Sequence, residues 1–221
     1  ANQYHNPENP RSHYLTTGPE IWEQTEGKVT DVIIGMGTGG TITGVGRFLK
    51  ERNPRIRIVG VDPYGSLLYE THKLGHLPDD PHPKTYKTEG IGEDFLPSSL
   101  DLSVVDTVIQ VSDKESFLMT RRLTREEGVF AGVSSGSAVA AALRYCRDLS
   151  SDRLVVVILP DAGSRYLSKA FDDDWMRENG FLDSTWSGAT AADVLATKKL
   201  REVIFALPNE LIPRVVAKMK Q

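Results

Sequence analysis

Short apolar runs alternate along the chain with longer segments in which apolar residues recur every three or four positions. Short runs of this kind are typical of buried strands, and the longer segments are typical of amphipathic helices. Strands are expected at 31–35, 56–61, 104–111 and 154–159. Helices are expected at 19–24, 41–52, 113–127 and 138–149, with short helices within 164–180. This alternation predicts an α/β fold built on a parallel sheet.

One long segment, 62–100, departs from the alternation. It is irregular and rich in proline, glycine and histidine. Loops of this length inside a compact domain are usually functional, or they contain an element that the sequence pattern does not reveal. The segment contains Gly90-Ile91-Gly92, which is therefore a candidate part of a binding site.

A glycine-rich turn, 35–41, joins the first expected strand to the helix that follows it. Glycines let the backbone approach an oxyanion, and the helix N-terminus favours its charge by roughly 0.3–1 kcal/mol. The spacing of Gly35, Gly37 and Gly40, with Asp62 at the end of the next strand, also fits a dinucleotide-binding turn. The two threonine hydroxyls of the turn favour a compact monophosphate instead. A turn that needs glycine only for steric reasons is the third interpretation.

Composition narrows the class of protein. With 221 residues, 39% hydrophobic and 25% charged, the chain can bury one good core and begin a second unit. The net charge of −4 gives no electrostatic footprint for nucleic acid or an anionic membrane. No apolar stretch approaches the roughly 18–20 residues that span a bilayer. Cys146 is the single cysteine, so no internal disulfide can form and a cytoplasmic location is expected.

The histidines do not have the spacing of a metal site, so no bound metal is expected. They are His5, His13, His72, His76 and His82.

Several motifs stand in one fixed order along the chain. They are Asn2-Gln3-Tyr4, Asn6-Pro7, His13-Tyr14, Thr16 to Trp22, Gly37 to Thr41, Glu89 to Gly92, Ser134 to Ser137 and Leu159-Pro160-Asp161. Together they resemble the fold-type II pyridoxal-phosphate enzymes of the cysteine synthase and cystathionine β-synthase group, over about residues 1–182. Within that group, Asp94-Phe95, Tyr166 to Lys169 and Asp174 to Leu182 are similar to the bacterial-type cystathionine β-synthase branch.

The resemblance implies a site at the carboxyl ends of the strands, where the loops at 37–41, 90–92, 132–137 and 160–162 are expected to converge on one pocket. The residues implied to bind the cofactor, pyridoxal 5′-phosphate, are Gly37, Thr38, Gly39, Gly40, Thr41, Ser134 and Asp161. The residues implied to border the amino-acid substrates are Gln3, Tyr4, Gly90, Ile91 and Gly92.

Ser134 matches the family's serine at the pyridine nitrogen of the cofactor. A hydroxyl is too weak an acid to keep that nitrogen protonated, which favours elimination at Cβ of the substrate over a long-lived carbanion. The alternative role for Ser134 is a cap at the N-terminus of the helix that starts near Ser137.

The implied activity is β-replacement, in which L-serine condenses with homocysteine to give cystathionine. Cysteine synthesis from O-acetylserine and sulfide is the alternative, because Glu93 stands where animal cystathionine β-synthases have tyrosine. The family's Schiff-base lysine precedes the matched region, so no catalytic residue is assigned to this chain. The chain alone is expected to be inactive, or to act as a non-catalytic module, and the full enzyme is expected to be a homodimer or larger homo-oligomer.

The character of the sequence changes after residue 182. Residues 1–182 are expected to form the large lobe of the catalytic domain, and 183–189 a linker. Residues 190–221 resemble the start of a nucleotide-sensing regulatory domain of the kind found in this family, although a simple helical tail is the alternative.

Overall fold

The computed structural model describes residues 2–183 of the chain. The chain divides into two compact units, Ala1–Leu182 and Asp183–Gln221. The first unit is described here. The expected linker beyond Asp183 and the expected regulatory segment 190–221 lie outside the described residues.

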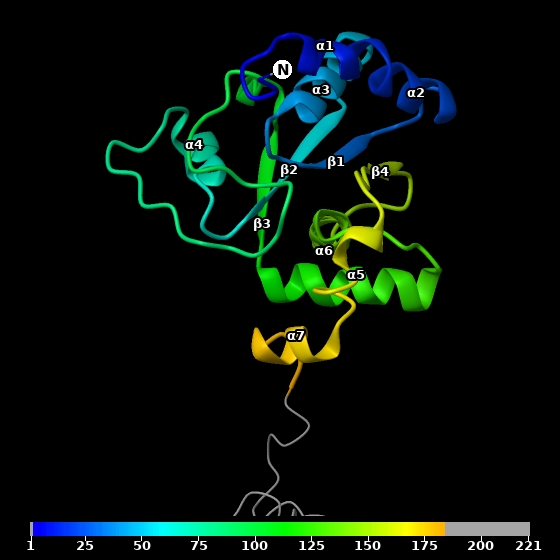
Figure 1. The fold of residues 1–221 in the computed structure, drawn as a ribbon. Coiled ribbons are helices and arrows are strands. Elements are labelled where there is room, and N and C mark those ends of the chain that lie inside the picture. Colours follow the sequence, from blue (N-terminus) through cyan, green and yellow to red (C-terminus); the bar gives the residue numbers. More distant parts are fainter. Residues whose placement is uncertain (1, 184–221) are drawn as a thin grey trace, which may run out of the picture. The chain divides into compact units, whose positions relative to one another are not determined.

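A four-stranded parallel sheet forms the centre of this unit, in the order β3-β2-β1-β4 (Figure 1). The strands are β1 (Asp31–Gly35), β2 (Arg57–Pro63), β3 (Thr107–Val111) and β4 (Val155–Val157). In the register, Ile33 of β1 lies beside Val59 of β2 and Val157 of β4. The α/β class and the parallel sheet predicted from the sequence are thus confirmed.

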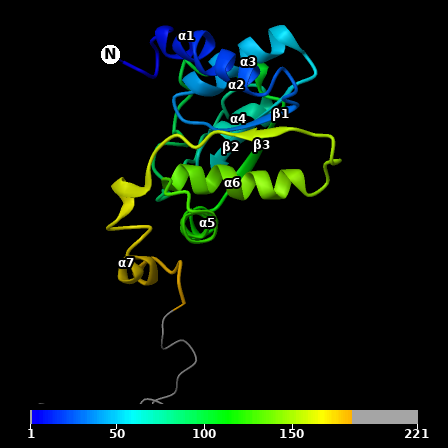
Figure 2. The same cartoon turned by 90° about the vertical axis from the view of Figure 1, so that its right-hand side faces the viewer.

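Helices cover both faces of the sheet (Figure 2). On one face lie α1 (Glu8–Leu15), α2 (Thr17–Gln24) and α3 (Gly40–Arg52), and on the other lie α5 (Asp113–Glu127) and α6 (Val133–Cys146). The remaining elements are α4 (Leu68–Leu74), α7 (Asp173–Glu178) and 3-10 turns at Leu102–Val104 and Gly163–Tyr166. Among the described residues, no helix is long and apolar enough to cross a membrane.

Each face of the sheet packs into its own apolar core, because successive side chains of a strand point to opposite faces. Val32 and Ile34 pack with α3 residues such as Leu49. Ile33, between them in β1, packs on the other side with Ala141 of α6. All four side chains mentioned from β1 and α3 are at most 1% exposed.

Two helices were not predicted. The first is α1, which contains Pro10 in its first turn, where the missing N–H costs no helical hydrogen bond. The second is α4, which lies inside the segment expected to be irregular. It ends at Gly75, whose φ of 78° gives the left-handed C-terminal cap that glycine favours.

The start of α6 was predicted wrongly. The sequence suggested a turn at 132–137 and a helix from 138, whereas the helix begins at Val133 after an N-cap at Gly132. Gly136 lies inside this helix because α5 passes so closely that an added Cβ would lie 2.2 Å from the Ser116 carbonyl oxygen. The glycine therefore marks a helix contact, not a turn.

The sequence favours Asp113 as the N-cap of the helix that ends at Glu127, whereas α5 already includes Asp113. Ser112 is the N-cap and forms a capping box with Glu115, in which each side chain bonds the other residue's backbone N–H. The helix ends at Gly128, as predicted.

Candidate functional site

The turn between β1 and α3 presents backbone N–H groups at the start of a 13-residue helix. Gly39 is the N-cap of α3 and has a φ of 84°, a conformation that side chains rarely adopt. A Cβ at Gly39 would lie 2.3 Å from Cβ of Leu100. A larger residue here would disturb the backbone itself, so substitutions at the threonines of the turn test ligand binding more directly.

The loop 90–92 lies directly against this turn. The N–H of Gly92 donates to the carbonyl oxygen of Met36 at 2.6 Å. A Cβ on Gly35 would lie 2.6 Å from a methyl group of Ile91, and a Cβ on Gly37 would lie 2.8 Å from the carbonyl oxygen of Gly90. Glycines at 35 and 37 thus allow the two loops to touch.

Two adjoining pockets, each of about 240 Å³, open where these loops meet. Both are lined by Gln3, Thr38, Gly90 and Ile91. The remaining residues of the first pocket are Ile34, Gly35, Gly37, Gly39, Thr41, Ile158 and Pro160. The remaining residues of the second pocket are Tyr4, Tyr86, Thr88, Gly92 and Glu93. The first pocket holds the loop threonines and therefore has the donors that an anion needs.

The N-terminal segment is fixed against both pockets by its backbone. The carbonyl oxygen of Gln3 accepts from Asn9 Nδ2 at 2.8 Å and from the Ser99 hydroxyl at 3.1 Å. The ring of Tyr4 packs edge-on against Phe95, with centroids 5.3 Å apart. The structure therefore places the two predicted substrate residues at the pocket walls.

Ser134 and Asp161 lie together at the N-terminus of α6. The N–H of Gly132 donates to the carbonyl oxygen of Asp161 at 3.0 Å, and the Tyr166 hydroxyl donates to the Asp161 carboxylate at 2.8 Å. Burial and the bond to Asp161 raise the pKa of Tyr166. The other Asp161 oxygen, Oδ1, is buried without a hydrogen-bond partner among the described residues.

The alternative role of Ser134 as a helix cap does not hold. The residue lies in the first turn of α6, one position after Val133, and the N-cap position belongs to Gly132. The residue is buried, with 3% exposed. The buried hydroxyl that has no hydrogen-bond partner among the described residues is that of the next residue, Ser135. A buried hydroxyl without a structural partner is available to a ligand.

Three of the four loops expected to converge do so around the first pocket. These are the loops that contain Thr38, Ile91 and Pro160. The fourth, the start of α6, is not part of the pocket lining. It joins the group through its backbone bond to Asp161, next to Pro160.

Asp62 cannot act as the ribose-binding acid of a dinucleotide site. Its side chain is fully buried, and its carboxylate accepts from the N–H of Tyr69 in the first turn of α4 at 2.9 Å. Burial, together with the nearby charge of Glu93, raises the pKa of Asp62 to about 7. The dinucleotide interpretation of the glycine turn therefore lacks its acid.

The raised pKa of Asp62 predicts a pH-dependent stability. An aspartate in an unfolded chain titrates near pH 4, so between about pH 4 and pH 7 the folded protein binds more protons than the unfolded one. The free energy of unfolding should therefore fall as the pH rises through this range. Asp62→Asn should reduce the slope, which melting temperatures at pH 4.5 to 8 would measure. Parallel curves for the two proteins would contradict this.

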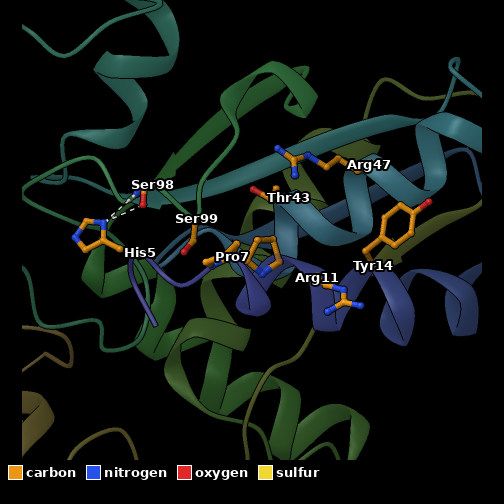
Figure 3. Close-up of a pocket in the computed structure, with 9 residues that line it drawn as sticks. His5, Pro7, Arg11, Tyr14, Thr43, Arg47, Ser98 and Ser99 are labelled. Atoms are coloured by element: carbon orange, nitrogen blue, oxygen red, sulfur yellow. Dashed lines mark hydrogen bonds between the residues drawn. The ribbon is translucent and has the colours of Figure 1, made fainter. Parts of the chain in front are cut away.

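A larger hollow, of about 510 Å³, lies where α1, α3 and residues 98–99 meet (Figure 3). Its polar side chains are already paired within the protein. His5 Nδ1 bonds the Ser98 hydroxyl at 3.0 Å, Arg47 bonds Asp101 at 2.7 Å, and Tyr14 bonds Glu51. Since these groups have partners, the hollow offers a ligand less than the loop pockets do.

Two residues that the sequence analysis did not assign to the site contact the loop threonines. Asn9 bonds Thr38, and His13 bonds Thr41. Their spacing of four residues would place them on one face of a helix. The nearby prolines, however, do not favour a helix in the sequence alone.

A parallel sheet with a glycine- and threonine-rich turn at the carboxyl ends of its strands is typical of phosphate-binding α/β proteins. Residues 1–161 match the family model for pyridoxal-phosphate-dependent enzymes. Because this match covers most of the chain, the chain belongs to that family.

Curated relatives agree with this assignment. The chain is 43% identical over 209 residues to the cystathionine β-synthase of Dictyostelium discoideum, covering 90% of this chain and 41% of that protein. It is 45% identical over 181 residues to the rabbit (Oryctolagus cuniculus) enzyme of that name, covering 82% and 32%. The Saccharomyces cerevisiae enzyme is 43% identical over 189 residues, covering 82% and 36%. The chain thus spans well under half the length of these relatives.

Proposed function

We propose that this chain supplies the cofactor-phosphate site and part of the substrate site of a β-replacement enzyme that condenses L-serine with homocysteine to cystathionine. The observation that carries the proposal is the turn at α3, where glycine N–H groups and two threonine hydroxyls surround one pocket. The name shared by the relatives, cystathionine β-synthase, supports the same activity.

The residues present fit pyridoxal phosphate. Thr38, Thr41 and the loop amides would hold the phosphate, and Ser134 would face the ring nitrogen. When bound, the cofactor supplies an electron-withdrawing ring that allows the substrate to lose its proton at Cα and its leaving group at Cβ. Ser134 is a neutral group and therefore leaves the ring nitrogen without a full positive charge.

The other pocket residues would serve the substrates. Gln3 and Tyr4 border the pocket on one side, and the loop 90–92 closes another. Apolar Ile91 between two glycines would shield the reacting atoms from water, which strengthens electrostatic interactions in the site. We further propose that the full enzyme is a homo-oligomer and that it is cytoplasmic; the single cysteine of this chain supports only the location.

Thr38→Val and Thr41→Val in the full-length enzyme test the phosphate site. A hydrogen bond to a charged group contributes about 1.5–3 kcal/mol, so each change should weaken pyridoxal-phosphate binding by roughly 10- to 150-fold. Binding of pyridoxal, which lacks the phosphate, should stay within about 2-fold of wild type, because valine keeps the shape of threonine. Titration of cofactor-free enzyme measures both. Unchanged affinity for pyridoxal phosphate would mean that the phosphate binds elsewhere.

The reaction itself is tested by supplying the full-length enzyme with L-serine and homocysteine and measuring cystathionine by mass spectrometry. Faster formation of cysteine from O-acetylserine and sulfide would replace the proposed activity with cysteine synthesis.

A further inference from the structure

One helix, α1, contacts the hydroxyls of both threonines of the turn, Thr38 and Thr41. Asn9 Nδ2 lies 3.0 Å from Thr38 Oγ1, and His13 Nε2 lies 3.1 Å from Thr41 Oγ1. Asn9 and His13 are four residues apart and so share one face of the helix. Neither residue lines the two loop pockets.

The contact at Thr38 fixes the direction of its hydroxyl proton. The two N–H groups of the Asn9 amide donate to the Gln3 carbonyl oxygen and to Thr38 Oγ1. The carbonyl can only accept, so the orientation of the amide is determined. Thr38 Oγ1 also accepts from the N–H of Gly40 at 3.4 Å. With both lone pairs engaged, the hydroxyl proton is left to donate into the pocket.

The contact between His13 and Thr41 fixes the direction of the Thr41 hydroxyl proton in a similar way. Burial lowers the pKa of His13, so its ring is neutral at pH 7 and has one N–H. Nε2 faces Thr41, and Nδ1 lies 2.9 Å from the Thr17 hydroxyl. If Nε2 has the proton, Thr41 accepts from it and keeps its own proton for the pocket. In the opposite tautomer, Nε2 would accept the hydroxyl proton of Thr41. The lone pairs of Thr41 Oγ1 would then face the anion.

Two glycines of α3 allow α1 to come this close. A Cβ on Gly40 would lie 1.8 Å from Asn9 Oδ1, and a Cβ on Gly44 would lie 2.2 Å from the carbonyl oxygen of Pro10 and 2.8 Å from Cβ of His13. The same two residues of α1 therefore depend on glycine in α3 to reach the turn.

We propose that Asn9 and His13 are positioning residues, which orient the hydroxyl protons of Thr38 and Thr41 toward the phosphate. In this role His13 is the Nε2–H tautomer. The inference rests on the proposed function, because it assumes that the phosphate binds at this turn. It assigns to α1 a role in selecting a phosphorylated ligand over its unphosphorylated form.

The test compares two ligands of the full-length, cofactor-free enzyme. His13→Leu should weaken binding of pyridoxal phosphate about 10-fold while changing that of pyridoxal less than 2-fold. Asn9→Leu should behave alike, and it provides a second variant if the first does not fold. Arg11→Gln, on an exposed part of the same helix, is the matched control and should change neither affinity. Equal losses for both ligands would show a merely structural role and overturn the inference.

Combined variants show whether His13 acts through Thr41. Once Thr41→Val has removed the hydroxyl, His13→Leu should cause no further loss of preference for the phosphorylated ligand. Fully additive losses would overturn the inference. If Thr41→Val and Thr38→Val themselves leave the preference unchanged, the proposed function fails; if they reduce it and His13→Leu does not, only the present inference fails.

The tautomer gives a readout independent of binding. Nitrogen-15 NMR of the histidine-labelled enzyme with cofactor bound should show a protonated Nε2 and an unprotonated Nδ1 for His13, assigned by loss of the signal in His13→Leu. The reverse assignment would overturn the inference.

Discussion

Ser134→Asp in the full-length enzyme is expected to lower turnover by roughly 30- to 1000-fold, which corresponds to about 2–4 kcal/mol in the barrier. The proposed partner of Ser134 is the ring nitrogen of the cofactor. A carboxylate there would keep the nitrogen protonated, so that charge at Cα is stabilised too well and departure of the Cβ group is slowed. Steady-state rates at saturating serine and homocysteine measure the effect, and absorbance of the bound cofactor should shift to longer wavelength.

Two controls separate this effect from damage to the fold. Ser134→Ala removes the hydroxyl without adding charge and should lose less activity. Cofactor content, measured for each variant, shows whether the site still fills. An unshifted spectrum with wild-type turnover in Ser134→Asp would mean that this hydroxyl does not face the ring.

Asp31→Asn is expected to lower the free energy of unfolding at pH 7 by about 3 kcal/mol. The carboxylate is fully buried at the start of β1 and accepts from Arg153 Nε and Nη2 at 2.9 and 2.8 Å and from the Tyr145 hydroxyl at 2.6 Å. An amide cannot balance the charge of the guanidinium. The loss should be at the low end of the range for buried pairs, because 28% of the Arg153 side chain is exposed and can regain water. Urea unfolding measures the change.

The same pair should respond to acid. Burial alone would raise the pKa of Asp31, but bonds from Arg153, Thr30 and Tyr145 hold it below its ordinary value. A carboxyl of this kind stabilises the fold above its unfolded pKa, near 4, and loses that effect as the pH falls through the lower, folded pKa. The difference between wild type and Asp31→Asn should therefore shrink below about pH 4. Glu8→Gln, which breaks an exposed pair with Arg11, should show little change at any pH.

The sheet could be predicted because its strands are local signals. The apolar run 31–35 has the bounds of β1, and the helix 113–127 has those of α5. The position of the glycine-rich turn between β1 and α3 could be predicted for the same reason, since all its glycines and threonines are contiguous.

The parts that could not be predicted depend on contacts between distant residues. In the sequence, Gly136 favours a turn. The close approach of α5 explains why a glycine lies inside α6. Asn9 meets Thr38 across 29 residues of sequence, and His13 meets Thr41 across 28. No local pattern contains such pairs, because they arise from how α1 packs on α3.

The packing of α1 against α3 also determines how steadily the turn is supported. At Gly40 the side chain of Asn9 packs directly on the main chain of α3, and at Gly44 main-chain atoms of α1 do so. Side chains change rotamer on the nanosecond scale or faster when they have room, whereas packed backbones move together. The close packing on Gly40 and Gly44 leaves the side chains of Asn9 and His13, which support Thr38 and Thr41, little room to change rotamer. Glycine, although it has no side chain, can in this way make the contact between two helices rigid.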